Sequence, residues 1–309
     1  MLLPVIFFIL GLLLIIKGAD WFTDASLSLA KRLNIPTIVI GATLVSVATT
    51  MPEFLTSLIA TIRGHTQIAI GNVLGSCICN LGLILGLVWL CSSYLPNRDR
   101  TVQIKSFFLI GMTLSVWLLS FGFGYTTRWL SLLLLGFTIL FLNYNRQLTL
   151  THRRTTVPIT LPQFSLPRTL LFFFLGLVAL LIGSDLLVRN GVTLAHTLGI
   201  SELAIGISLI AIGTSLPELA TAIASIIKHH PELSVGNLLG ADVLNLGLII
   251  GVCGLVSPLP LSHITRVLSL PLLLLLTLIV FSPRGNIRLR GLSLLCIYIA
   301  YLILHLWYG

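Results

Sequence analysis

Residues 41–86 read GATLVSVATTMPEFLTSLIATIRGHTQIAIGNVLGSCICNLGLILG, and residues 206–251 read GISLIAIGTSLPELATAIASIIKHHPELSVGNLLGADVLNLGLIIG. The two segments align without a gap. Each copy places a lone glutamate directly after a proline inside an apolar stretch, Glu53 in the first and Glu218 in the second. An ionisable residue in the core of a bilayer costs at least a few kcal/mol, so its presence in both copies indicates a functional site.

The duplication extends beyond these segments. At the same offset in residue number that aligns the two segments, Gly18 and Asp20 match Gly183 and Asp185. The repeated unit therefore covers about half the chain, which is far longer than the period of a solenoid repeat. We expect a first repeat over residues 1–144, a linker over 145–167 and a second repeat over 168–309.

The composition is that of an integral membrane protein. Hydrophobic residues make up 56% and charged residues 9% of the chain, and the mean hydropathy is +1.07. The lipid bilayer is therefore the expected partner. The net charge of +9 is spread over short loops, which favours a topological role over nucleic-acid binding. The 5 cysteines lie in apolar runs and are interpreted as buried hydrophobic residues, neither a disulfide framework nor a metal cluster.

The hydrophobic runs predict an all-α membrane protein. The amino-terminal run lacks a basic start and a small-residue cleavage site, so we expect a retained transmembrane helix there. At roughly 20 apolar residues for each crossing, the sequence predicts ten transmembrane helices. These cover residues 4–28, 35–62, 67–90, 103–122, 128–144, 168–190, 199–227, 232–256, 264–282 and 288–307.

The distribution of Lys and Arg predicts the topology. Assigned to alternate sides, the basic residues lie mostly on the side of the linker, which places the linker in the cytoplasm and both termini outside the cell (inner) membrane. Each half holds an odd number of helices, so the two five-helix repeats have inverted orientations, as in secondary transporters. The linker side holds Lys31, Arg32, Arg98, Arg100, Lys105, Arg146, Arg153, Arg154, Arg168, Lys228, Arg284, Arg288 and Arg290, and the other side holds Arg63, Arg128, Arg189 and Arg266.

Oxygen-bearing side chains share one helix face around each glutamate. Their spacing of three and four residues brings them together on a helix, and each proline leaves a carbonyl near residue 48 or 213 without its helical donor. Freed carbonyls are tolerated at membrane depth only beside something polar, such as an ion. The face of the first copy holds Ser46, Thr49, Thr50 and Glu53, and that of the second holds Ala211, Thr214, Ser215 and Glu218.

The next helix of each copy adds amide side chains. The first copy has Asn72, Ser76 and Asn80, and the second has Asn237, Ala241 and Asn245. The combined set offers oxygen ligands without thiolate or imidazole, which suits hard cations, and two carboxylates neutralise one calcium ion or the sodium ions that replace it. For the amides of Asn72 and Asn237, direct ligation and the fixing of helix contacts both stay open.

These motifs resemble those of the sodium/calcium exchangers of the calcium/cation antiporter superfamily, in particular the prokaryotic ten-helix members. The motif GTSLPE is intact at Gly213 to Glu218 and altered to ATTMPE at Ala48 to Glu53, and a GN-x-x-G-[SA] run follows at Gly71 and again at Gly236. The resemblance covers both halves and nearly the whole chain.

The resemblance implies electrogenic exchange of sodium for calcium by alternating access, with cations bound at the midplane between the repeats. It implies neither a cofactor nor an enzymatic reaction, and we expect no obligate protein partner. By position, the calcium ligands are Glu53, Glu218, Thr49 and Thr214. The flanking, sodium-associated set is Ser46, Thr50, Ser76, Asn80, Ala211, Ser215 and Asn245, and the supporting residues are Asn72, Asn237 and Asp242.

The chain departs from the family pattern at three positions. Ala241 stands where serine is common, which removes one hydroxyl. Asn245 stands where some members, including the potassium-dependent branch, have aspartate, so potassium cotransport is not expected. Asp242, one turn away, is interpreted as a supporting charge.

Two other functions use the same glutamates. A calcium/proton antiporter would carry protons on them, but that branch has its acid in a GN-x-x-E motif, whereas Val73, Leu74 and Gly75 follow Asn72 here. An intramembrane acid–base enzyme lacks support from any nucleophile or phosphate-binding motif. Asp20 and Asp185 are expected outside the site, paired with basic neighbours or water.

Overall fold

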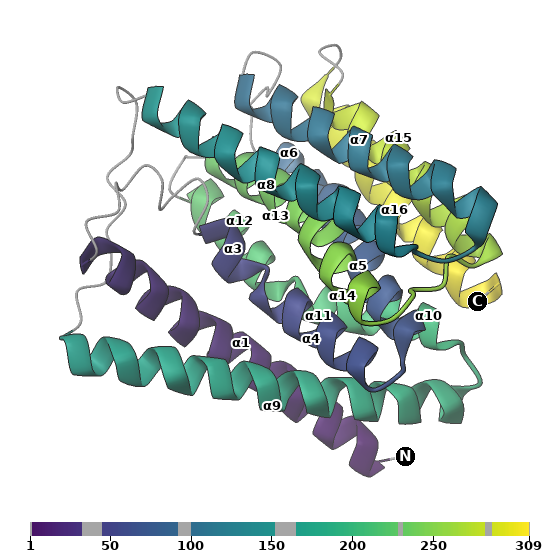
Figure 1. Cartoon of the computed structure of the whole chain (residues 1–309), viewed down its shortest axis with the longest axis horizontal. Helices are drawn as coiled ribbons and strands as arrows, with labels where there is room; N and C mark the ends of the chain where they lie inside the picture. Colours follow the sequence, from purple (N-terminus) through teal and green to yellow (C-terminus); the bar gives the residue numbers. More distant parts are fainter. Residues whose placement is uncertain are drawn as a thin grey trace.

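The computed structural model describes residues 2–32, 45–91, 100–151, 165–227, 231–281 and 286–308 (Figure 1). Within these ranges the chain is helical, and its β-type pairing is an isolated bridge between Tyr125 and Pro260. The expectation of an all-α protein is confirmed.

Several of the helical segments contain π-helical turns (η). In chain order they are α1 (Leu2–Arg32), α3 (Val45–Thr49), α4 (Met51–Ile62), α5 (Thr66–Cys79), η2 (Asn80–Ile84), α6 (Leu85–Cys91), α7 (Arg100–Phe123), α8 (Arg128–Thr151), α9 (Leu166–Leu198), α10 (Glu202–Ile205), η4 (Gly206–Ile210), α11 (Ala211–Thr214), α12 (Leu216–Ile227), α13 (Pro231–Leu244), η5 (Asn245–Ile249), α14 (Ile250–Val256), η6 (Thr265–Ser269), α15 (Leu270–Phe281) and α16 (Ile287–Tyr308).

The largest differences from the expected helix boundaries are at the ends of α9 and α8. Helix α9 was expected to end at residue 190 but continues to Leu198, where Gly199 adopts the left-handed conformation (φ +68°) that ends a helix most readily at glycine. Helix α8 runs to Thr151, so the first residues of the expected linker are helical. Residues 152–164 of that linker lie outside the described ranges, and its last residues already belong to α9, which begins at Leu166.

The predicted helices at 35–62 and 199–227 are interrupted in the structure. In the first, α3 ends at Thr49 and α4 begins at Met51, and residues 33–44 lie outside the described ranges. In the second, α11 ends at Thr214 and α12 begins at Leu216, with a bend of 41° between the two parts. Each interruption lies two residues before the proline of the Pro-Glu pair, because proline cannot donate to the preceding turn.

The helices are long and apolar enough for a multi-pass membrane protein. Among the described residues, 6 helices meet the length and composition needed to cross a bilayer, and a seventh is the bent pair from α10 to α12. The outer helices α1, α7, α9 and α16 expose large apolar side chains, such as Phe107 and Leu13. This surface suits contact with lipid chains.

Helices α1 and α9 form an antiparallel pair that crosses one side of the bundle (Figure 1). Their contact runs through glycines that face the opposite backbone. A methyl group on Gly11 would lie 2.9 Å from the Gly183 carbonyl, and one on Gly18 would lie 3.0 Å from that of Gly176. The absence of side chains lets the two helices pack at backbone contact.

The most buried helices lie at the centre of the bundle. The spans Thr66–Cys91 and Ser234–Val256 are largely buried, whereas Leu2–Ala25 is mostly exposed. Helix α5 packs on α4 of its own half and on α10, η4 and α11 of the other half, and α13 packs on α12 and on α3. The two interrupted helices therefore meet near the middle of the molecule.

Candidate functional site

The two glutamates lie at the interruptions and are completely enclosed. The exposed fraction is 0% for Glu53 and 1% for Glu218. Each follows a residue that leaves regular helix geometry, Thr50 (φ −79°, ψ −4°) and Ser215 (φ −86°, ψ 6°). A buried carboxylate in an apolar bundle is stable only with polar or cationic partners.

Each glutamate receives a hydroxyl from the opposite copy. Ser215 Oγ donates to Glu53 Oε1 at 3.0 Å, and the Thr49 side chain hydrogen-bonds to the Glu218 carboxylate. The second oxygen of each carboxylate, Oε2, has no hydrogen-bond partner among the described residues. The pair thus presents two buried, unsatisfied carboxylate oxygens.

Asn72 links the first glutamate to the second interruption. Its Nδ2 donates to Ser57 Oγ at 2.9 Å and to the Glu53 carbonyl at 3.3 Å. Its Oδ1 accepts a hydrogen bond from Thr214 Oγ1 at 3.0 Å. The amide oxygen of Asn72 therefore holds the Thr214 side chain in place.

Asn237 makes the corresponding contacts in the second copy. Its Oδ1 accepts from Ser46 Oγ at 2.9 Å, and its Nδ2 lies 3.5 Å from Thr221 Oγ1. Thr221 in turn donates to the Glu218 carbonyl at 2.9 Å. Both asparagines therefore fix the interruption of the opposite copy, which favours the interpretation that they secure helix contacts.

The flanking hydroxyls differ between the copies. Thr50 Oγ1 donates to the Ser46 carbonyl at 2.6 Å, whereas its counterpart Ser215 donates to a carboxylate. Ser76 Oγ lies 3.5 Å from Thr214 Oγ1, and Ala211 accepts from Thr214 through its carbonyl at 3.2 Å.

A second polar cluster lies where η2 and η5 begin. Asn80 Nδ2 donates to Asp242 Oδ1 at 2.8 Å, and the Cys77 thiol contacts both Asp242 and Asn245. All four residues are 0% exposed. The π-helical segments that start at Asn80 and Asn245 have the same sequence, NLGLI, and such segments occur frequently at functional sites.

All the expected site residues lie in the polar clusters described above. In the first copy they come from the segment α3 to η2, and in the second copy from the segment α11 to η5. Sequence reasoning missed Ser57 and Thr221, which hold the two asparagines; their positions three or four residues after each glutamate put them on the same helix face and were the available signal. Within the described residues, no three His, Cys, Asp or Glu side chains converge as metal ligands do.

A cavity of about 500 Å³ reaches the site from one side. Its lining includes Thr49, Pro217 and Thr221 from the site, together with Asp20 and Asp24 of α1. Asp20 also pairs with Lys17 at 3.6 Å. The expectation that Asp20 has a basic neighbour is confirmed.

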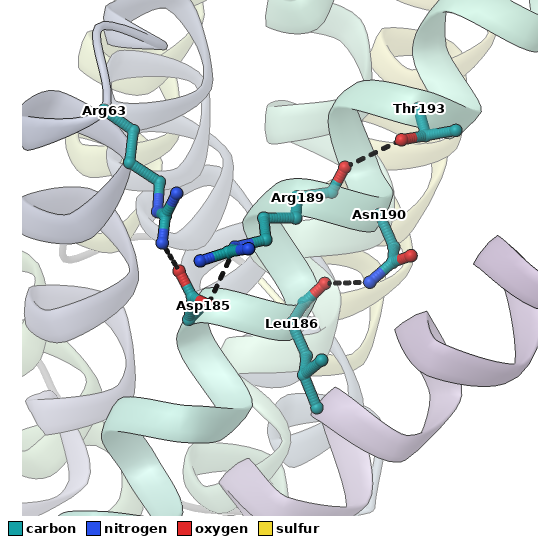
Figure 2. Close-up of polar contacts among 6 residues, drawn as sticks. All are labelled: Arg63, Asp185, Leu186, Arg189, Asn190 and Thr193. Carbon is teal, nitrogen blue, oxygen red and sulfur yellow. Dashed lines mark hydrogen bonds and ion pairs between the residues drawn. The ribbon is translucent and has the colours of Figure 1, made fainter.

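The equivalent region on the other side holds polar contacts that join the end of α4 to α9. Figure 2 shows Arg63 and Arg189 on the two sides of the Asp185 carboxylate; the Arg189 Nε to Asp185 Oδ2 distance is 2.9 Å. Deeper in the same interface, Thr56 Oγ1 donates to Ser184 Oγ at 3.0 Å. Asp185 thus has the basic partners that were expected.

The chain matches known proteins over nearly its whole length. A family model described as "Sodium/calcium exchanger protein" matches residues 3–145 and 168–307. The uncharacterized membrane protein MJ0091 of Methanocaldococcus jannaschii is 32% identical over 97% of both chains, and the sodium/calcium exchanger MaX1 of Methanosarcina acetivorans is 27% identical over 96% of both. The solved structure of the sodium-calcium exchanger NCX_Mj superposes with a TM-score of 0.68, at 29% identity and 98% coverage of both chains.

Proposed function

The chain belongs to the sodium/calcium exchanger family, and on this basis we propose that it exchanges sodium for calcium across the membrane by alternating access. The observation that carries the proposal is the buried pair Glu53 and Glu218, each with an unpartnered carboxylate oxygen. Two carboxylates balance the charge of one calcium ion, and calcium accepts six to eight oxygen ligands in adaptable geometry.

In this proposal the calcium ligands are Glu53, Glu218, Thr49 and Thr214. Sodium uses the flanking oxygens of Ser46, Thr50, Ser76, Asn80, Ala211, Ser215 and Asn245. Asn72 and Asn237 support the site by fixing helix contacts, since the amide oxygen of each accepts a hydrogen bond from a hydroxyl of the opposite copy. Calcium and sodium are the transported substrates, and the proposal needs neither a resident cofactor nor a second protein.

We further propose ten transmembrane helices in two inverted five-helix repeats, residues 1–144 and 168–309, with the ions between them at the midplane. The antiparallel glycine contacts of α1 and α9 support this, since Gly11 faces Gly183 while Gly18 faces Gly176. A twofold axis between the repeats produces such exchanged contacts. The excess of Lys and Arg on the linker side supports a cytoplasmic linker and external termini in the inner cell membrane.

The first prediction concerns the coupling ion. Proteoliposomes that contain the purified protein and are loaded with sodium should take up calcium on dilution into sodium-free buffer, because outward sodium flow drives the exchange. Radioactive calcium uptake measures this, with protein-free vesicles as the control. If a pH gradient drives uptake and a sodium gradient does not, the protein is a cation/proton antiporter.

The second prediction concerns access. The cavity reaches Thr221 on one side, whereas its counterpart Thr56 is buried and donates to Ser184 in the interface that also holds the Arg63–Asp185–Arg189 contacts. We expect Thr221→Cys to react with a membrane-impermeant thiol reagent and Thr56→Cys to resist it. Asp185→Asn should raise labelling of Thr56→Cys by a few-fold, since partly exposed ion pairs contribute up to about 1 kcal/mol each.

Both cysteines are introduced into a background in which Cys91 and Cys296 are replaced by alanine, because these two side chains are exposed and not buried as the sequence predicted. Asp20→Asn is the control for Asp185→Asn, because Asp20 is the counterpart on the open side. Equal labelling of Thr56→Cys and Thr221→Cys in inside-out and right-side-out vesicles contradicts the proposal of a one-sided access route.

A further inference from the structure

Lys105 is a buried lysine that reaches the glycine motif of the second copy. It lies on α7, its exposed fraction is 3%, and its Nζ donates to the Gly236 carbonyl at 2.7 Å. A buried lysine is rare, because its ammonium group gives up contact with water. A role in topology alone requires only that Lys105 lie near the linker side, so its burial calls for a second explanation.

The Lys105 ammonium lies beside a hydroxyl of the candidate site. A methyl group on Gly240 would lie 2.9 Å from Ser46 Oγ and 3.5 Å from Lys105 Nζ, so both polar atoms border the same point. Ser46 in turn donates to Asn237 Oδ1 at 2.9 Å, and its carbonyl accepts from Thr50 Oγ1 at 2.6 Å. Lys105 therefore brings a positive charge close to the oxygens of the first interruption.

The matching place in the other copy is packed differently. A methyl group on Gly75, the counterpart of Gly240, would lie 2.6 Å from both the Ala211 side chain and the Ile207 carbonyl oxygen. The atoms nearest to Gly75 are thus apolar or backbone atoms. At the same offset in residue number, the counterpart of Lys105 is Leu270, which is buried and apolar. Lys105 thus makes the two copies unequal in charge.

The part of the site beside Lys105 also has fewer oxygens. Ser76 and Ala211 form one flank of the site, the Ser76 flank, where Thr214 Oγ1 lies 3.5 Å from Ser76 Oγ and 3.2 Å from the Ala211 carbonyl. Their counterparts Ala241 and Ser46 form the other flank, the Ser46 flank. Alanine at position 241 supplies no hydroxyl. Hard cations need oxygen ligands and are repelled by a nearby positive charge, so both differences disfavour sodium at the Ser46 flank.

We propose that the Lys105 ammonium is a resident cation that takes the place of one sodium ion at the Ser46 flank. An ammonium group and a sodium ion carry the same charge, and the three ammonium donors bind carbonyl and hydroxyl oxygens. The inference rests on the proposed function and narrows it, since sodium then binds at the Ser76 flank while the Ser46 flank faces Lys105. Lys105 thereby sets how many sodium ions the protein binds.

Equilibrium dialysis with radioactive sodium tests this by counting the ions bound to purified protein at saturation. Lys105→Met/Ala241→Ser removes the ammonium and restores the hydroxyl, so it should bind one sodium ion more per protein than the wild type. Ala241→Ser alone should bind the wild-type number, because Lys105 still fills the Ser46 flank. An equal count in the wild type and the double variant overturns the proposal, and so does an extra ion in Ala241→Ser alone.

Two controls separate the charge of Lys105 from its shape and from lysine removal in general. Lys105→Arg/Ala241→Ser keeps the positive charge and should bind the wild-type number of sodium ions; one extra ion in this variant overturns the proposal. Lys17→Met/Ala241→Ser removes an exposed lysine that pairs with Asp20 and should also bind the wild-type number. If Lys105→Met/Ala241→Ser does not yield folded protein by size-exclusion chromatography, Lys105→Gln/Ala241→Ser replaces it, with the same expected gain.

The sodium count does not depend on transport, so it separates this inference from the proposed function. If wild-type proteoliposomes show no sodium-driven calcium uptake but the double variant gains one bound sodium ion, the exchange function is rejected and the resident cation is supported. Normal uptake by the wild type without that gain supports exchange and rejects the resident cation.

Discussion

Glu53→Gln and Glu218→Gln should each abolish sodium-driven calcium uptake, with a loss of about 100-fold or more. Each substitution keeps the size of the side chain but removes half the formal charge of the pair and one strong ligand oxygen. A 100-fold loss corresponds to about 2.7 kcal/mol, a modest value for one charge in a desolvated site. Radioactive calcium uptake into sodium-loaded proteoliposomes measures the effect.

Glu202→Gln is the matched control for both variants. Glu202 carries the same side chain but lies in α10, where it contacts His65 at 3.0 Å and is partly exposed. We expect this variant to transport calcium at the wild-type rate. Calcium uptake at that rate by either Glu53→Gln or Glu218→Gln, with protein of normal size-exclusion behaviour, would refute the two-carboxylate site.

Gly75→Ala should destabilise the protein by about 2 kcal/mol or more, because the added methyl group has no space. It would lie 2.6 Å from both the Ile207 carbonyl oxygen and the Ala211 side chain. Those atoms belong to η4 and α11, which are held against α5 at this glycine, so the backbone itself must shift. Overpacking of a well-packed core costs about 1–3 kcal/mol, and more where backbone moves.

Gly136→Ala in α8 provides the comparison for this substitution. A methyl group there meets nothing within 4 Å, and alanine is favoured over glycine in a helix by about 0.5–1 kcal/mol. Thermal unfolding of the purified proteins in detergent should therefore show a lower Tm for Gly75→Ala and an equal or higher Tm for Gly136→Ala. Equal Tm values for the two variants would contradict the close approach of α5 to α11.

Local patterns in the sequence were sufficient to predict much of the fold. The apolar runs predicted helices, and the two Pro-Glu pairs marked the places where α3 and α11 are interrupted. The spacing of Ser46, Thr49 and Glu53 placed them on one face because helix periodicity depends only on positions near one another in the chain. The same reasoning could not predict that α9 continues past residue 190, because the apolar pattern of α9 fades before the helix ends at Leu198.

The sequence by itself therefore determined the helical class and the duplication, and it predicted the residues that we propose to carry the site's chemistry. Only the tertiary structure decided how these residues pair: Ser215 with Glu53, Thr214 with Asn72, and Asp242 with Asn80. Each of these contacts joins the two copies, whose sequences are more than a hundred positions apart. Hydrophobic periodicity fixes which face of a helix is buried, but which partner occupies that face depends on how both copies pack together.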